Sequence, residues 1–92
     1  MNRVRWTTPA AADFARIVEH IHKDNPSAAH RVAQTIYKRV AALRMFPHRG
    51  RIGLAPDTRE LVFAPLPYVV VYEIIDEDVQ VLRIRHTSQD WP

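Results

Sequence analysis

The stretch YVVVYEII at residues 68–75, followed by DED at 76–78 and VQVLRIRH at 79–86, decides the fold of this 92-residue chain. Both long segments are rich in β-branched residues, which favour strands. The acidic triplet between them is short enough for a hairpin turn. Another strand is predicted over 59–64, before a connection that Pro65 and Pro67 widen. The C-terminal third therefore predicts a three-stranded antiparallel sheet.

Two helices are predicted before this sheet, each opened by a polar cap residue followed by proline. Thr8-Pro9 opens the first, which ends near Asp24, and Asn25-Pro26 opens the second, which ends before Pro47. A short strand over 3–6 precedes them. The apolar stripes of the helices are Phe14, Ile17, Val18 and Ile21, then Val32, Ile36, Val40 and Leu43. The order predicts an α+β domain with a tight helical hairpin on one face of the sheet.

Composition limits the class of protein further. The length fits one domain over 1–92, and the lack of cysteine excludes disulfides and thiolate chemistry. No apolar run approaches the roughly 18 residues of a membrane span, and the first residues lack a signal peptide, so a cytoplasmic location is expected. From Asn25 to Pro56 there is no acid, but there are six lysines and arginines. This one-signed segment favours an anionic partner.

The alternation of residues in the strands predicts which sheet face is covered by the helices. The residues expected to face the helices are Leu61, Phe63, Tyr68, Val70, Tyr72, Ile74, Leu82 and Ile84. On the open face, Arg83 or Arg85 is expected to neutralise Glu73 across strands. The open face would then hold Glu60, Val62, Val69, Val71, Glu73, Arg83 and Arg85. So apolar a face predicts an exposed patch for a partner.

The ordered set of segments resembles the RelE/ParE superfamily, the toxins of type II toxin–antitoxin systems in the plasmid stabilisation family. The resemblance rests on the helical hairpin and the Phe46-Pro47…Gly50-Arg51 loop, and on four later segments. These are 58–61, 68–72, 81–86 and Gln89-Asp90-Trp91. It implies a cognate antitoxin that covers apolar residues of the hairpin and sheet, for which the candidates are Phe14, Ile17, Ile36, Val69 and Val71.

The superfamily offers two activities, and the resemblance favours the ParE-like one, the poisoning of DNA gyrase by binding. RelE-like members are ribosome-dependent nucleases that cut mRNA, with an arginine at the position of Val69 and lysines at those of Glu60 and Val62. A valine cannot stabilise a phosphate and a carboxylate repels one. The aromatic acid–base residue near the C-terminus is missing too. The chain is therefore expected to act by binding rather than as an enzyme.

The alternatives remain open at this stage. A nuclease acting on the ribosome and its mRNA would rely on Arg59, Arg83 and His86. Target or nucleic-acid binding would rely on Arg49, Arg51, Arg83 and Arg85. A third possibility is a non-toxic nucleic-acid-binding or interaction module. No cofactor or metal is expected, since His20 and His22 are two apart on a helix and do not face each other.

Overall fold

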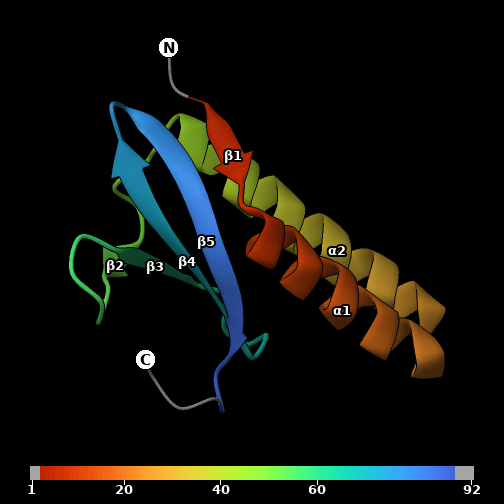
Figure 1. Cartoon of the computed structure of the whole chain (residues 1–92). Helices are drawn as coiled ribbons and strands as arrows, with labels where there is room; N and C mark the ends of the chain where they lie inside the picture. Colours follow the sequence, from red (N-terminus) through yellow and green to blue (C-terminus); the bar gives the residue numbers. More distant parts are fainter. Residues whose placement is uncertain (1–2, 89–92) are drawn as a thin grey trace.

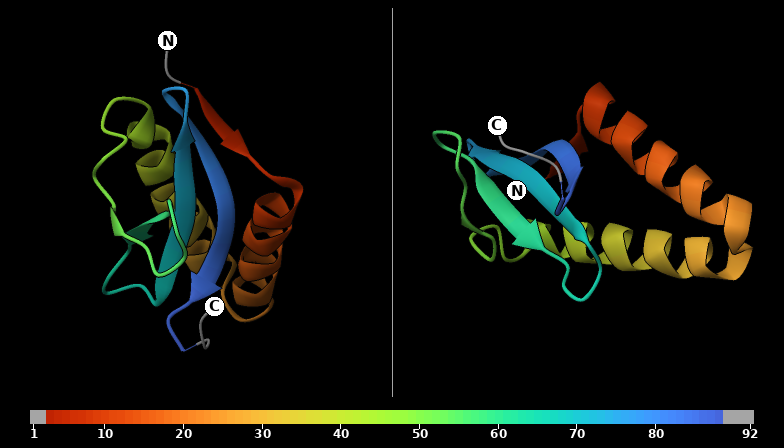
Figure 2. Two further views of the ribbon diagram at one scale, coloured as in Figure 1. Left: turned by 60° about the vertical axis from the view of Figure 1, so that its left-hand side comes forward. Right: turned by 90° about the horizontal axis from the view of Figure 1, so that it is seen from below.

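The computed structural model describes residues 3–88, so the Gln89-Asp90-Trp91 part of the resemblance lies outside the described residues. A helical hairpin packs against one face of a twisted sheet, which confirms the α+β class (Figures 1 and 2). The elements are β1 (Val4–Trp6), α1 (Thr8–Asp24), α2 (Pro26–Ala41), the 3-10 turn η1 (Ala42–Arg44), β2 (Arg51–Ile52), β3 (Arg59–Val62), β4 (Tyr68–Ile75) and β5 (Asp78–His86).

The two helices begin at side-chain caps. Asn25 caps α2 as predicted, because its Oδ1 accepts from the Ala28 amide at 3.0 Å, while its own amide donates to Ile21 and closes α1. The predicted cap of α1 was wrong by one residue. Thr7, not Thr8, caps it, since β1 leads directly into an extended Thr7 whose Oγ1 accepts from the Ala10 amide at 3.2 Å. Within residues 3–88, neither helix has the length and apolarity to cross a bilayer.

The sheet has five strands in the order β1-β5-β4-β3-β2, so the predicted three-stranded sheet was incomplete. The short strand predicted over 3–6 is confirmed as β1, and it joins this sheet. The three predicted strands form its centre and are antiparallel to one another. The additions are the edges: β1 pairs in parallel with β5, and the two-residue β2 pairs with β3. Both edge strands are too short to show a periodicity from which their pairing could be predicted. The β1–β5 pairing also joins distant parts of the sequence.

The core lies between the hairpin and the helix-facing side of the sheet. Tyr68, Val70 and Tyr72 of β4 are buried there, as the alternation predicted, together with Leu61 and Phe63. Strand β5 departs from strict alternation. The register shifts from Val71 opposite Arg83 to Tyr72 opposite Val81, which leaves Leu82 as an extra, unpaired residue. Because of this bulge, Val79, Val81 and Ile84 are the buried residues of β5, and the prediction that Leu82 shares the face of Ile84 was wrong.

The open face is not the exposed apolar patch that was predicted. Val69 and Val71 are each 5% exposed and Glu60 is 3% exposed. Glu60 is held by Arg51, whose Nη2 lies 2.9 Å from Oε1. The expected neutralisation of Glu73 was also wrong for Arg83, because the Arg83 guanidinium binds Asp13 of α1 instead. Large exposed apolar side chains lie elsewhere, at Tyr37, Met45, Phe46, Ile52, Leu54 and Ile75.

Candidate functional site

The loop between α2 and β3 is braced from inside by Tyr72 of β4. The Tyr72 hydroxyl donates to the Pro47 carbonyl at 2.7 Å and accepts from the Gly50 amide at 2.8 Å. Burial raises the pKa of Tyr72, against the opposing effects of the Gly50 amide and of Arg59, so the hydroxyl keeps its proton at neutral pH. A Cβ at position 50 would lie 2.6 Å from this oxygen, so only glycine fits.

A second brace comes from Arg59 of β3. Its Nη1 donates to the Gly50 carbonyl at 2.8 Å and, at 3.4 Å, to that of His48. A charged donor on backbone carbonyls fixes the path of the loop more strongly than a neutral one. Arg59 therefore holds the loop in shape through the backbone carbonyls that its Nη1 binds.

The braced loop presents apolar side chains to solvent. Met45, Phe46, Ile52 and Leu54 are between 53% and 75% exposed, and together they are called the loop surface below. The Arg49 guanidinium lies 4.9 Å from the centre of the Phe46 ring. Exposed aromatic and aliphatic groups mixed with arginine are the composition of protein-binding hot spots. The loop surface thus has the chemistry of a contact site.

A second candidate site lies at the other end of the sheet, around Asp13 of α1. The Asp13 carboxylate is 5% exposed and accepts from Nε and Nη2 of Arg83 at 2.8 and 3.0 Å, and from Nη2 of Arg16 at 2.7 Å. It also accepts from the Ile84 amide at 2.9 Å, on the edge of β5 that β1 leaves uncovered. Burial favours the protonated acid, but these bonds outweigh it and hold the pKa of Asp13 below its ordinary value.

Asp13 forms the base of a pocket between α1 and the end of β5. The pocket encloses about 380 Å³. His86 lies at its rim, with its ring edge-on to Tyr68 at 5.6 Å and its Nδ1 accepting from the Ser88 amide at 3.1 Å. This Asp13 pocket is lined by Asp13, Arg16, Ile17, His20, Tyr68, Arg83, Ile84, Arg85 and His86. It combines arginines and histidines with an apolar floor.

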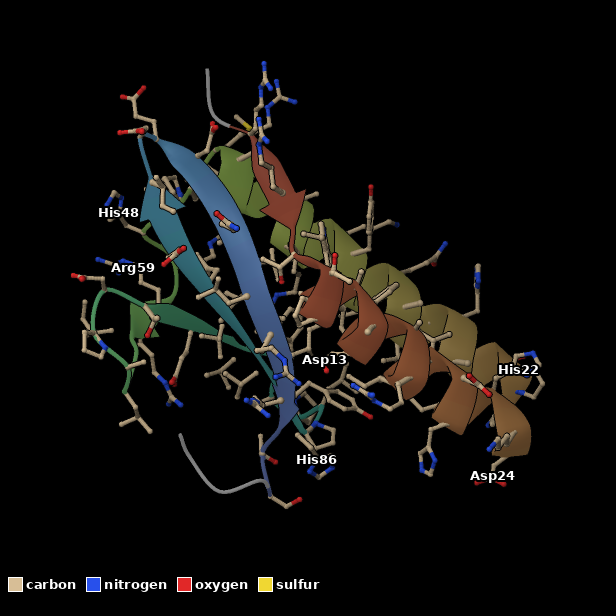
Figure 3. The ribbon with its side chains drawn as sticks, viewed as in Figure 1. Asp13, His22, Asp24, His48, Arg59 and His86 are labelled. Atoms are coloured by element: carbon tan, nitrogen blue, oxygen red, sulfur yellow. The ribbon has the colours of Figure 1, made fainter. Side chains whose placement is uncertain are left out.

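The structure divides the predicted site residues between these two places (Figure 3). Of the nuclease candidates, Arg83 and His86 line the Asp13 pocket, while Arg59 binds the backbone of the loop. Of the predicted binding arginines, Arg83 and Arg85 line the pocket, and Arg49 and Arg51 belong to the loop. Neither predicted set converges on one point.

The residues predicted to bind an antitoxin are scattered in the same way. Ile36 is fully buried beneath the hairpin, and Val69 and Val71 are nearly so. Ile17 lines the Asp13 pocket, while Phe14 lines a separate groove on the hairpin together with Ala15, Val18, Glu19, His22 and Ala33. Phe14 and Ile17 of the predicted set therefore border surface hollows.

The histidines of α1 point to different hollows, as their spacing predicted. His20 lines the Asp13 pocket and His22 lines the hairpin groove. Among residues 3–88, no three His, Asp or Glu side chains are grouped as metal ligands would be.

Sequence reasoning missed Asp13 and Arg16. A signal was present, because Asp13 lies three residues after the buried Ala10 and four before Ile17, on the apolar stripe of α1. An acid on such a stripe needs a partner when it is buried. Its partner Arg83 is 70 residues away in the sequence, so the pair itself was not visible there.

Comparisons with known proteins agree along nearly the whole chain. The model for the ParE toxin of the type II toxin–antitoxin system parDE matches residues 4–91. The putative toxin Y4kP of Sinorhizobium fredii is 43% identical over 90 residues, covering 98% of this chain and 93% of that protein. Toxin RelE2 of Caulobacter vibrioides is 39% identical over 89 residues, covering 97% and 99%.

Solved structures give the same fold. One chain of the chromosomal ParDE system from P. aeruginosa superposes with a TM-score of 0.85 at 27% identity, covering 96% of this chain and 98% of that one. The isolated E. coli RelE toxin has a TM-score of 0.66 at 16% identity, covering 96% and 86%. The second likeness concerns the fold alone. The described fold is therefore shared by proteins named for both branches.

Proposed function

The chain belongs to the ParE toxin family of type II toxin–antitoxin systems, and from this premise we propose that it acts by binding and poisoning DNA gyrase. A cognate antitoxin would be its inhibitor. The proposal implies a cytoplasmic site of action, where the bacterial chromosome lies. Because the chain belongs to a family of toxins, a module without toxin activity, the third possibility left open by the sequence, is no longer favoured.

The observation that carries the proposal is the loop surface. Tyr72 and Arg59 bind backbone groups of Pro47, His48 and Gly50, so the backbone that carries the loop surface is held in place before any partner arrives. A surface ordered in advance loses less entropy on binding. Phe46, with Arg49 over its ring, resembles the aromatic and arginine anchors that dominate protein interfaces. Exposed anchors of this kind suit a toxin that works by contact.

The open sheet face supports the same proposal. The resemblance implies that a nuclease would have cationic side chains at three positions of this face. Here these positions are occupied by the carboxylate Glu60 and the apolar Val62 and Val69. Glu60 is paired with Arg51, and Val69 is almost buried. Among residues 3–88, this face brings no lysine to those positions, and a carboxylate there would oppose a phosphate.

An mRNA nuclease is the second candidate, and one observation favours it. The Asp13 pocket gathers Arg83, Arg85 and His86, which is a cationic set with an acid–base group. The name of the relative RelE2 points in the same direction. In this alternative the pocket, not the open face, would hold the reacting phosphate.

A supercoiling assay with purified gyrase tests the proposal. The toxin should inhibit supercoiling and trap cleaved DNA, and Phe46→Ser should weaken inhibition about tenfold or more, as expected for loss of an aromatic anchor. Tyr37→Ser is the matched control, since Tyr37 is an exposed aromatic residue of α2 outside the loop surface. Full supercoiling at excess toxin, with mRNA cut in a ribosome-dependent reaction that His86→Ala abolishes, would instead establish the nuclease.

The antitoxin is proposed to cover the hairpin groove. Phe14 and Val18 line this groove, and apolar surface left open on a domain of this size favours a partner. Phe14→Ser should reduce co-purification with the antitoxin encoded beside the toxin, while Phe46→Ser should leave it unchanged. Equal retention by both variants would place the antitoxin elsewhere.

A further inference from the structure

The Asp13 pocket has a chemistry that contact with gyrase through the loop surface does not use. We propose that it is a binding site for a phosphate monoester attached to a nucleoside, as in a 5′-nucleotide or the 5′-phosphorylated end of a nucleic-acid strand. This ligand class goes beyond the proposed function, and its binding can be measured without gyrase or ribosomes.

Charge is the first argument. Three arginines and one carboxylate line the pocket, which leaves a net charge of two positive before His20 and His86 are considered. A phosphate monoester carries about 1.5 to 2 negative charges at neutral pH, whereas a carboxylate side chain carries one. The pocket therefore matches the phosphate more closely than an acidic side chain of a protein.

The second argument is the fixed geometry of the guanidinium groups. Asp13 engages Nε and Nη2 of Arg83 and Nη2 of Arg16, and each guanidinium has five N–H donors, more than these bonds to the carboxylate use. A buried acid that anchors two arginines acts as a positioning residue. Arginines held in this way bind a phosphate with little further loss of side-chain entropy.

The third argument is the apolar floor. Ile17, Ile84 and Tyr68 line the pocket beside the cations, and the His86 ring stands edge-on to Tyr68. A flat base can lie against such aromatic and aliphatic groups. The volume of about 380 Å³ is within the range of small-ligand pockets. Hydrogen-bond donors for a phosphate, next to an apolar floor, fit a nucleotide better than they fit an isolated anion.

The pocket is separate from the loop surface. Asp13 and His86 lie toward one end of the sheet, and His48 and Arg59 lie toward the other (Figure 3). A nucleotide and a protein held by the loop surface can therefore be bound at the same time. The pocket would allow a toxin on gyrase to contact a phosphorylated strand end as well.

Calorimetric titration of the full chain tests the site. Adenosine 5′-monophosphate should bind about tenfold tighter than adenosine, since the phosphate supplies the charge-assisted bonds. Arg16→Ala should weaken binding of the monophosphate about tenfold, and Arg16→Lys less. Arg16 suits this test because its side chain is 69% exposed, so the variant should fold. Arg5→Ala, which removes an exposed arginine of β1 outside both the pocket and the loop surface, is the matched control and should bind normally.

Further ligands identify the source of the phosphate. A trinucleotide with a 5′-phosphate is compared with the same trinucleotide ending in a 5′-hydroxyl, and with a glutamate-rich peptide. Tighter binding of the phosphorylated trinucleotide than of the monophosphate would support a strand end, and the reverse a free nucleotide. Equal binding of adenosine and its monophosphate, equal loss in Arg16→Ala and Arg5→Ala, or tighter binding of the peptide would each overturn the proposal.

Discussion

The two ends of the sheet use arginine in opposite ways. At the loop end, Arg59 donates to the backbone of the loop and Arg51 pairs with Glu60, and large apolar side chains are exposed beside Arg49. At the pocket end, Arg16 and Arg83 share the single carboxylate of Asp13 and line the hollow. The same basic composition therefore yields an apolar contact surface at one end and a cationic cavity at the other. Net charge alone would have described both as basic.

The largest expected effect comes from removing the carboxylate that organises the pocket end. Asp13→Ala leaves the half-buried Arg83 and the Ile84 amide without their partner, which should cost about 2–3 kcal/mol of the free energy of unfolding. Arg16→Ala, which removes the exposed partner of the same carboxylate, should cost less than about 1 kcal/mol. Urea unfolding followed by circular dichroism measures both. Equal losses would mean that Asp13 is not the anchor of α1 on β5.

A smaller effect is expected at the loop end. Tyr72→Phe removes one hydroxyl and leaves the Pro47 carbonyl and Gly50 amide unpaired, which should cost about 1–2 kcal/mol. The loop should lose its fixed shape, so gyrase inhibition should fall even under conditions where the variant is still fully folded. Tyr68→Phe is the control, because Tyr68 contributes its ring to the Asp13 pocket. If Tyr72→Phe inhibited gyrase normally, order in the loop would not matter for the target.

The third prediction separates the two ends by pH. The pKa of Asp13 is lower in the folded chain than its ordinary value near 3.8, so its ionised form stabilises the fold above that pH. This stabilisation is lost as the pH falls through the lower, folded-state pKa. Asp13→Asn should remove this contribution and flatten the acid limb of stability, whose slope per proton is at most about 1.4 kcal/mol per pH unit.

Asp24→Asn serves as the control in the acid titration. Asp24 is an exposed carboxylate at the end of α1, so its replacement should leave the steepness of the acid limb unchanged. Thermal unfolding between pH 2 and 6 compares the three proteins, roughly the range in which carboxyl groups titrate. An acid limb as steep in Asp13→Asn as in the parent would contradict the prediction.

Local signals predicted the helical hairpin and the centre of the sheet. Asn25-Pro26 caps and starts a helix through its own side chain and ring, and the β-branched run at 68–75 forms β4 with the predicted bounds. One local prediction failed, the cap of α1, which is Thr7 rather than Thr8. The other failures concern features that depend on a neighbour in space. The bulge at Leu82 depends on the register between β4 and β5, and the burial of Val69 depends on the strands on both sides of it. The parallel pairing of β1 joins residues that are far apart in the chain.

The sequence by itself determined the class of fold, the family and the lack of acids over 25–56, because capping, periodicity and composition act over a few residues. Only the tertiary structure decided how the cations are used. It brought Asp13 to Arg83 across the edge of β5, and it turned Arg59 toward the loop backbone. The reason is physical: a buried charge is stabilised by whichever donors the fold brings within hydrogen-bonding distance, and that distance is unrelated to separation along the chain.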